Sequence, residues 1–148
     1  MTHIVSVEER HLDDIEHIER ECFSMPWTRE QLRHQMGDDH IFICAENENG
    51  RAVGYVGLMH VLDEGYISNV AVSSDFRRQG IADALLDELR RRGEAKGLSF
   101  MTLEVRAGNA PARALYAKHG YRDVGLRKNY YERPREDAVL MTLYLNEA

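Results

Sequence analysis

Cysteine and proline are scarce in this sequence, and their scarcity excludes several classes of protein. The two cysteines, Cys22 and Cys44, cannot build a framework of disulfides, and neither belongs to a CxxC pair. We therefore expect both thiols to be reduced and buried. Only three prolines interrupt the 148 residues, and no repeat or low-complexity segment offers a linker. Residues 1–148 are predicted to form a single domain.

Long apolar runs, metal-binding motifs and an excess of positive charge are also lacking. The longest apolar runs, 41–45 and 52–59, are too short to span a bilayer, and the charged N-terminal segment is unlike a signal peptide. We expect a cytoplasmic protein with no membrane partner. The seven histidines show no HExxH spacing, so no metal site is predicted. The net charge of −6 argues against nucleic acid as a direct partner, while leaving room for a local basic site.

The hydrophobic pattern predicts a mixed α/β fold. Apolar residues at helical spacing predict helices over 12–23, from Gly80 onward and over 110–119, and the capping-box pair Thr28 and Gln31 predicts another, reaching Met36. Strands are predicted at 3–7, 40–46, 52–60, 65–72, 99–107, 122–128 and 137–145. A hairpin turn is expected at 47–50, a turn at 63–64 and a loop at 129–136.

One connection in this order fixes part of the sheet. The chain leaves the strand that ends at Val72, passes through a helix, and enters the strand that begins near Ser99. Such a connection joins two parallel neighbouring strands by a right-handed crossover. The sheet is otherwise expected to be antiparallel.

The loop before that helix, Arg77-Arg78-Gln79-Gly80, has three interpretations on its own residues. Helix N-termini present unpaired backbone N–H groups and bind phosphate, and a glycine permits close approach. The loop matches neither GxxxxGK[ST] nor GxGxxG. An anion site, a basic patch for nucleic acid and an ordinary solvated turn therefore all remain open.

Two longer stretches of the sequence, one of which contains the loop, resemble a known protein family. The segments NVAVSSDFRRQGIADALL (69–86) and LEVRAGNAPARALYAKHGY (103–121) resemble the GCN5-related N-acetyltransferase (GNAT) superfamily. Its signature, Arg/Gln-x-x-Gly-x-Gly/Ala between a bulged strand and a helix, is matched here by Arg77, Gly80 and Ala82. The resemblance covers essentially the whole chain and implies a mixed, mostly antiparallel sheet flanked by four helices.

Two further segments resemble one branch of that superfamily. FSMPW (23–27) and RKNYYERPREDAVLM (127–141) are similar to the RimI-like ribosomal-protein-alanine N-acetyltransferases. The resemblance implies acetyl-coenzyme A as cofactor and the N-terminal peptide of a ribosomal protein as partner. We expect the protein to be a monomer or a weak dimer.

The resemblance also implies where acetyl-coenzyme A binds. The cofactor would lie where the strands ending at Val72 and Val105 splay apart. Its pantetheine arm would pair with the backbone of Val70, Ala71 and Val72, where a backbone N–H would polarise the thioester carbonyl. Asn109 matches a cofactor-contacting asparagine, and it is equally suited to cap the helix that follows it. The pyrophosphate would contact backbone amides of a run of residues: Arg77, Arg78, Gln79, Gly80, Ile81 and Ala82.

Catalytic roles follow from the same resemblance. Glu104 would be the general base for the attacking α-amine, directly or through water, and Tyr116 would protonate the departing sulfur. From the residues alone, Glu104 is a solvated carboxylate on a strand and Tyr116 an aromatic in a helix core. The reaction implied is direct transfer in a ternary complex, because neither cysteine lies in a nucleophile motif.

Two loops would select the substrate. Met25 and Trp27 would form one wall of the cleft, and Tyr130 and Tyr131 the other, enclosing an N-terminal amine. Core packing is the alternative for Trp27, and an exposed hairpin loop is the alternative for the tyrosines. Since neighbouring strand residues face opposite ways, we expect only one of the two tyrosines to contact substrate. Acetylation of a small amine, or acyl-coenzyme A binding without catalysis, are the rival functions.

Overall fold

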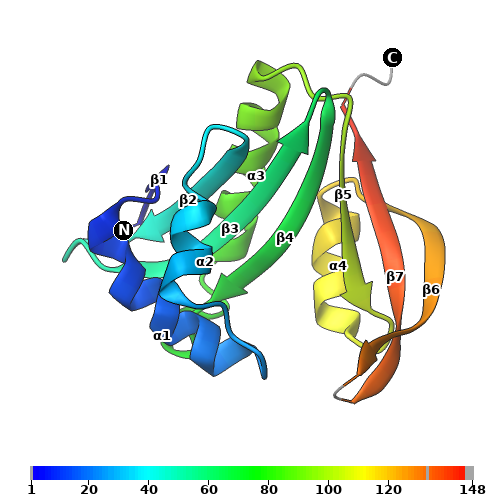
Figure 1. Ribbon diagram of the computed structural model, residues 1–148, viewed down its shortest axis with the longest axis horizontal. Helices are drawn as coiled ribbons and strands as arrows, with labels where there is room; N and C mark the ends of the chain where they lie inside the picture. The colour runs from blue at the N-terminus through cyan, green and yellow to red at the C-terminus, as the bar shows by residue number, and fades with distance from the viewer. Residues whose placement is uncertain (1, 133, 146–148) are drawn as a thin grey trace.

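The computed structural model describes residues 2–132 and 134–145, which are built around a seven-stranded sheet (Figure 1). The strand order is β1-β2-β3-β4-β5-β7-β6, and among neighbours only β4 and β5 are parallel. The strands are β1 (His3–Ser6), β2 (His40–Glu46), β3 (Ala52–Val61), β4 (Glu64–Val72), β5 (Phe100–Arg106), β6 (Arg122–Glu132) and β7 (Arg135–Tyr144). The α-helices are α1 (Leu12–Cys22), α2 (Arg29–His34), α3 (Ile81–Ala95) and α4 (Ala110–Lys118). The predicted fold class and the parallel crossover pair are confirmed.

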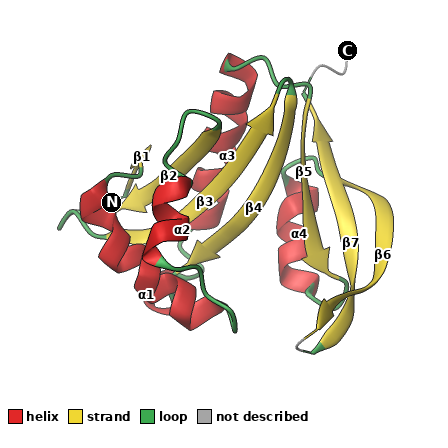
Figure 2. Cartoon of the chain, in the orientation of Figure 1, coloured by secondary structure: helices red, strands yellow, loops and turns green. Residues whose placement is uncertain are grey.

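The helices cover both faces of the sheet (Figure 2). In β2, Ile41 and Ile43 pack with α3, whereas Phe42 and Cys44 pack with α1 and α2 on the opposite face. Alternate residues of a strand point to opposite faces, so both sets are buried. This explains why β2 is continuously apolar instead of alternating with polar residues. No helix among the described residues is long and apolar enough to cross a membrane.

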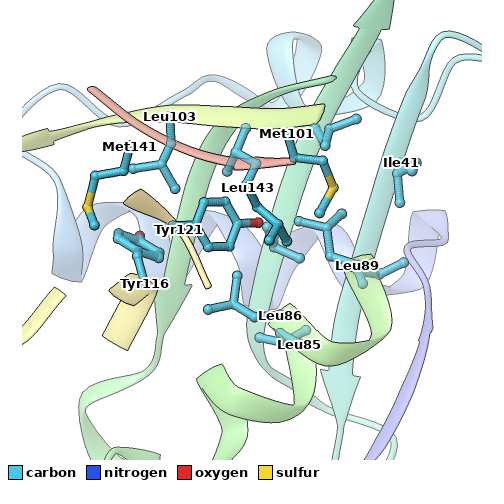
Figure 3. Close-up of a cluster of buried hydrophobic side chains, with 14 of the residues drawn as sticks. Ile41, Leu85, Leu86, Leu89, Met101, Leu103, Tyr116, Tyr121, Met141 and Leu143 are labelled. Atoms are coloured by element: carbon cyan, nitrogen blue, oxygen red, sulfur yellow. The ribbon is translucent and has the colours of Figure 1, made fainter. Parts of the chain in front are cut away.

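The larger core lies between α3, α4 and the sheet. Figure 3 shows the leucines of α3 directed toward side chains of β5 and β7, with Tyr116 and Tyr121 beside them. The buried apolar face of α3 includes Ile81, Leu85, Leu86 and Leu89. This packing holds α3 and its N-terminal loop against the strands that form the site.

Strands β4 and β5 are joined at one end only. Their pairing couples Glu64–Tyr66 with Phe100–Thr102 and then stops, although β4 runs to Val72 and β5 to Arg106. Ser68 has no register partner in β3, because the pairing skips from Ile67 to Asn69, although its hydroxyl contacts that strand by donating to the Gly57 carbonyl at 3.3 Å. Such a bulge bends a strand and increases its twist. The two strands therefore diverge (Figure 1), and beyond Tyr66 this edge of β4 has no strand partner among the described residues.

The last two strands are longer than predicted. Most of segment 129–136 was expected to be a loop, but β6 continues to Glu132 and β7 begins at Arg135. Asn129 suggested a loop, yet it adopts a φ of 54° within a register shift between Arg127 and Tyr131. It forms a bulge inside the hairpin rather than ending the strand. The turn expected at 63–64 likewise lies one residue earlier, at 62–63.

Candidate active site

The divergence of β4 and β5 opens a cavity of about 860 Å³. Its walls come from the segment between α1 and α2, from β4 and β5, from α4, and from the β6–β7 hairpin. Predicted catalytic, cofactor and substrate residues meet in this cavity: Met25, Trp27, Val70, Glu104, Asn109, Tyr116, Tyr130 and Tyr131. Residues far apart in the sequence are therefore gathered around one space.

The other predicted cofactor residues lie outside this cavity. Ala71 packs against the core under α1, and Ile81 is buried in the core under α3. Val72, Arg77, Arg78, Gln79, Gly80 and Ala82 continue along the end of β4 and into the first turn of α3. These residues form a second, more exposed region next to the cavity rather than part of its lining.

Both arginines of the loop before α3 are exposed, and the backbone there adopts an unusual conformation. Arg78 and Gly80 both have left-handed conformations, with φ values of 63° and 79°. Gly80 is the N-cap of α3 and supplies no side-chain hydrogen bond to the first helical turn. Arg77 is exposed, but its Nε donates to the Val72 carbonyl at 3.2 Å and a terminal nitrogen contacts the Cys22 Sγ at 3.4 Å. The turn presents the N-terminus of α3, where backbone N–H groups lack intrahelical partners and are able to bind an anion.

Glu104 projects from β5 into the cavity. The Tyr130 hydroxyl donates to Glu104 Oε2 at 3.0 Å, and Arg127 Nε lies 3.5 Å from Oε1. About a third of the Glu104 side chain is exposed, at 34%. The carboxylate is thus accessible from the cavity while two groups of β6 hold its orientation.

Tyr116 reaches the same cavity from α4. Its residue is 8% exposed, and burial raises the pKa of its hydroxyl to about 12. The phenol therefore keeps its proton at neutral pH and remains a hydrogen-bond donor. Asn109 caps α4, because its side chain accepts from the Ala112 backbone N–H at 3.2 Å. The capping interpretation of Asn109 is confirmed.

Helix α4 is fixed to α3 by charged groups. Asp83, in the first turn of α3, contacts Lys118 Nζ at 2.7 Å and His119 Nε2 at 2.8 Å. These contacts keep the pKa of the Asp83 carboxyl below its usual value. The pairing holds the wall that carries Tyr116 next to the loop at Gly80.

Both tyrosines of the hairpin line the cavity, although neighbouring residues of a strand ordinarily face opposite ways. Their rings meet edge to face with centroids 5.1 Å apart, and the bulge at Asn129 breaks the usual alternation. The Arg106 guanidinium lies 4.2 Å from the centre of the Tyr131 ring. This cation–π contact anchors the hairpin to β5.

Sequence reasoning missed a buried polar cluster at the opposite wall. Glu19 is 1% exposed, lines the cavity, and accepts hydrogen bonds from Trp27, Tyr55 and Asn69. The helical spacing could have predicted that Glu19 is buried, since it falls on the apolar stripe of α1, four residues after Ile15 and three before Cys22. Cys22 was expected to be buried, but it is half-buried and lines the cavity.

The arrangement is suited to moving protons between two bound molecules. An accessible carboxylate and a protonated, buried phenol face one cavity, the usual division between a general base and a general acid. Across residues 2–132 and 134–145, no three His, Cys, Asp or Glu side chains gather as metal ligands. Burial raises the pKa of both thiols, that of Cys44 to about 12, which makes each a weak nucleophile.

Comparison with known proteins adds independent information. A family model described as "Acetyltransferase (GNAT) family" matches residues 12–121. A relative from Escherichia coli strain K12, named "[Ribosomal protein bS18]-alanine N-acetyltransferase", is 36% identical over 145 residues, which cover 97% of each chain. A protein of the same name from Haemophilus influenzae is 33% identical over 148 residues, covering 98% of this chain and 100% of its own.

A solved structure resembles the whole chain. The crystal structure of the ribosomal-protein-S18-alanine N-acetyltransferase from Escherichia coli superposes with a TM-score of 0.91 and 34% sequence identity. The superposition covers 100% of this chain and 96% of that one. The likeness therefore extends from β1 to the β6–β7 hairpin.

Proposed function

This chain belongs to the GNAT family of acetyltransferases, and we propose that it transfers an acetyl group from acetyl-coenzyme A to a protein's N-terminal α-amine. The proposed acceptor is the N-terminal alanine of a ribosomal protein, the substrate class in the names of the E. coli and H. influenzae relatives. One observation carries the proposal: the diverging β4 and β5 bring a cofactor edge, two proton-transfer groups and two aromatic walls to one cavity.

The open edge of β4 fits the extended arm of acetyl-coenzyme A. The Ser73 N–H donates to the Val53 carbonyl in β3, so strand alternation directs the N–H groups of Val70 and Val72 away from β3. Those N–H groups then face the gap left by β5, where an extended ligand can pair with them. The exposed turn at Gly80 fits the pyrophosphate, because a Cβ there would meet nothing within 4 Å.

Acetyl-coenzyme A supplies an activated acyl carbon and a thiolate leaving group. In the proposal, Glu104 accepts the proton that the attacking amine must lose, directly or through water. The Tyr116 hydroxyl donates its proton to the departing sulfur, for which its raised pKa keeps it protonated. The transfer needs no acyl-enzyme, and the raised thiol pKa values of Cys22 and Cys44 support this.

The acceptor peptide would enter between the two aromatic walls. Trp27 packs on the core under α1 and also lines the cavity, while Met25 is 76% exposed at its rim. Tyr130 and Tyr131 form the facing wall. In the proposal, an entrance between aromatic walls admits a chain terminus more readily than a lysine set within a folded backbone.

The substrate class is tested by mass spectrometry of acetylated peptides. Incubation with acetyl-coenzyme A should add one acetyl group to a peptide that begins with alanine. The same peptide with a blocked N-terminus should stay unmodified even when it contains a lysine. Turnover of small amines without any acetylated peptide would overturn the peptide assignment and favour the small-molecule rival.

The proton-transfer roles are tested by Glu104→Gln and Tyr116→Phe. Each variant should lower kcat by about 10²–10⁴-fold, the range for loss of a general acid or base. Binding of acetyl-coenzyme A, measured by calorimetry, should remain close to that of the unaltered protein. Leu126→Ala is a control on the exposed face of β6. Full activity in both Glu104→Gln and Tyr116→Phe would contradict these roles. A non-catalytic acyl-coenzyme A binding module instead predicts no acetyl transfer by the unaltered protein and unchanged cofactor binding in both variants.

The proposed pyrophosphate-binding turn at Gly80 is tested by substituting a matched pair of glycines. Gly80 and Gly97 stand at opposite ends of α3 with φ values of 79° and 77°, and neither has an atom within 4 Å of a Cβ. Valine at either position carries a similar left-handed penalty, about 1–2 kcal/mol. Only Gly80→Val should severely weaken acetyl-coenzyme A binding, because only that loop contacts the pyrophosphate.

Arg77→Ala completes that series. Because the Arg77 side chain is occupied by the Val72 carbonyl and Cys22, its removal should weaken cofactor binding only modestly. Equal cofactor affinities for Gly80→Val and Arg77→Ala would show that the side-chain charge matters as much as the amides. A comparable loss in Gly97→Val would show that the effect comes from general strain in α3.

A further inference from the structure

Glu19 forms a buried polar cluster that the proposed chemistry does not use. Its Oε1 accepts from the Trp27 backbone N–H at 2.7 Å, and its Oε2 accepts from Asn69 Nδ2 at 3.0 Å and from the Tyr55 hydroxyl. All three donors are neutral groups. A buried carboxylate is retained only where such donors replace water.

The cluster connects residues 24–27, which form the cavity wall proposed to contact the acceptor peptide, to the sheet. Within residues 24–27, the bond from Trp27 to Glu19 is the only hydrogen bond that the described residues make. The segment is otherwise irregular and exposed, with Met25 at its tip. Together with the packing of Trp27 on the core, the hydrogen bond to Glu19 therefore holds this segment in place beside the cavity.

The cluster contacts the sheet at the bulge in β4. Ile67, Val70 and Val72 all pack toward α3, although 67 and 70 are three residues apart. The unpaired Ser68 accounts for this and turns Asn69 to the face covered by α1, where it reaches Glu19. Asn69 directly precedes Val70, so the cluster links the peptide wall to the edge proposed for the thioester.

Glu19 is placed to position other groups rather than to exchange protons. Its two oxygens already accept three hydrogen bonds and it is 1% exposed, whereas the Glu104 side chain is open to the cavity. Desolvation raises the pKa of the Glu19 carboxyl, and the N–H groups of Trp27 and Asn69 oppose that rise by stabilising the anion.

We propose that Glu19 is a positioning residue whose carboxylate locks segment 24–27 against the β4 bulge and so sets how tightly the acceptor peptide is held. The effect on peptide binding rests on the proposed function, but the effect on the position of residues 24–27 does not. Glu19→Gln removes the negative charge and one of the two acceptor oxygens, so the Trp27 N–H, the Tyr55 hydroxyl and the Asn69 amide no longer share a carboxylate, and one side of the cluster must face an NH₂ group.

The fluorescence of Trp27 reports on residues 24–27 without any need for enzymatic activity, since Trp27 is the only tryptophan of the chain. In Glu19→Gln, its fluorescence should shift to longer wavelength and acrylamide should quench it more strongly. The double variant Glu19→Gln/Asn69→Asp lets the new amide donate to a carboxylate and should restore the original spectrum. Glu30→Gln, an exposed change of the same kind on α2, should leave the spectrum unaltered.

The kinetic readout separates positioning from loss of folded protein. Glu19→Gln should raise the KM for the acceptor peptide about tenfold, the effect of one lost hydrogen bond to a charged group. The dissociation constant of acetyl-coenzyme A should change little, and the double variant should recover the peptide KM. A lower kcat with unchanged KM would indicate only fewer folded molecules and would overturn the proposal.

Tyr55→Phe provides a second route if Glu19→Gln does not fold. It removes one donor while keeping the ring, and should give a smaller fluorescence shift of the same sign. Trp27 fluorescence unchanged in every folded variant would overturn the positioning role. If the unaltered protein acetylates no peptide, the proposed function fails, and the fluorescence series still decides what Glu19 does.

Discussion

The parting of β4 from β5 after Tyr66 and Thr102 is the constraint on which the rest of the site depends. Two parallel strands that stay paired leave no room between them for a ligand, because each satisfies the other's backbone groups. Here the bulge at Ser68 bends β4 away, while β5 follows β7 instead. The separation leaves backbone donors of β4 facing open space and exposes the face of β5 that carries Glu104. The proposed cofactor edge and the proposed base thus depend on the same local irregularity.

The remaining contacts hold separate elements at the rim of that gap. Asp83 ties α4 to α3, Arg106 holds the Tyr131 ring against β5, and Glu19 joins the α1–α2 segment to β4. Each is a polar contact between elements that are distant in sequence. The apolar core under α3 holds the helices against the sheet, whereas these polar contacts determine the positions of the side chains around the cavity. Both walls are therefore held from outside the reacting centre, which suits a site that must align two substrates.

Local pattern predicted the fold well, because hydrophobic spacing and the capping pair Thr28 and Gln31 act within a few residues. The parallel crossover followed from chain order and handedness. The Tyr130-Tyr131 strand was mistaken for a loop because Asn129 and Pro134 are ordinary turn residues, and a bulge differs from a turn only in its pairing. The link from Glu19 to Asn69 depends on the register of β4 against β3, which no local signal encodes. Glu104 and Tyr116 were singled out by a family resemblance, since neither has a distinctive local pattern.

Hydrogen exchange at the β4 edge, followed residue by residue by NMR, tests the central claim most directly. In the free protein, the amides of Val70 and Val72 should exchange faster than that of Ala71, whose N–H faces β3 by strand alternation. Saturating acetyl-coenzyme A should slow exchange at Val70 and Val72, with little change at Ala71. Exchange at Val70 and Val72 that is indifferent to bound acetyl-coenzyme A would contradict the account.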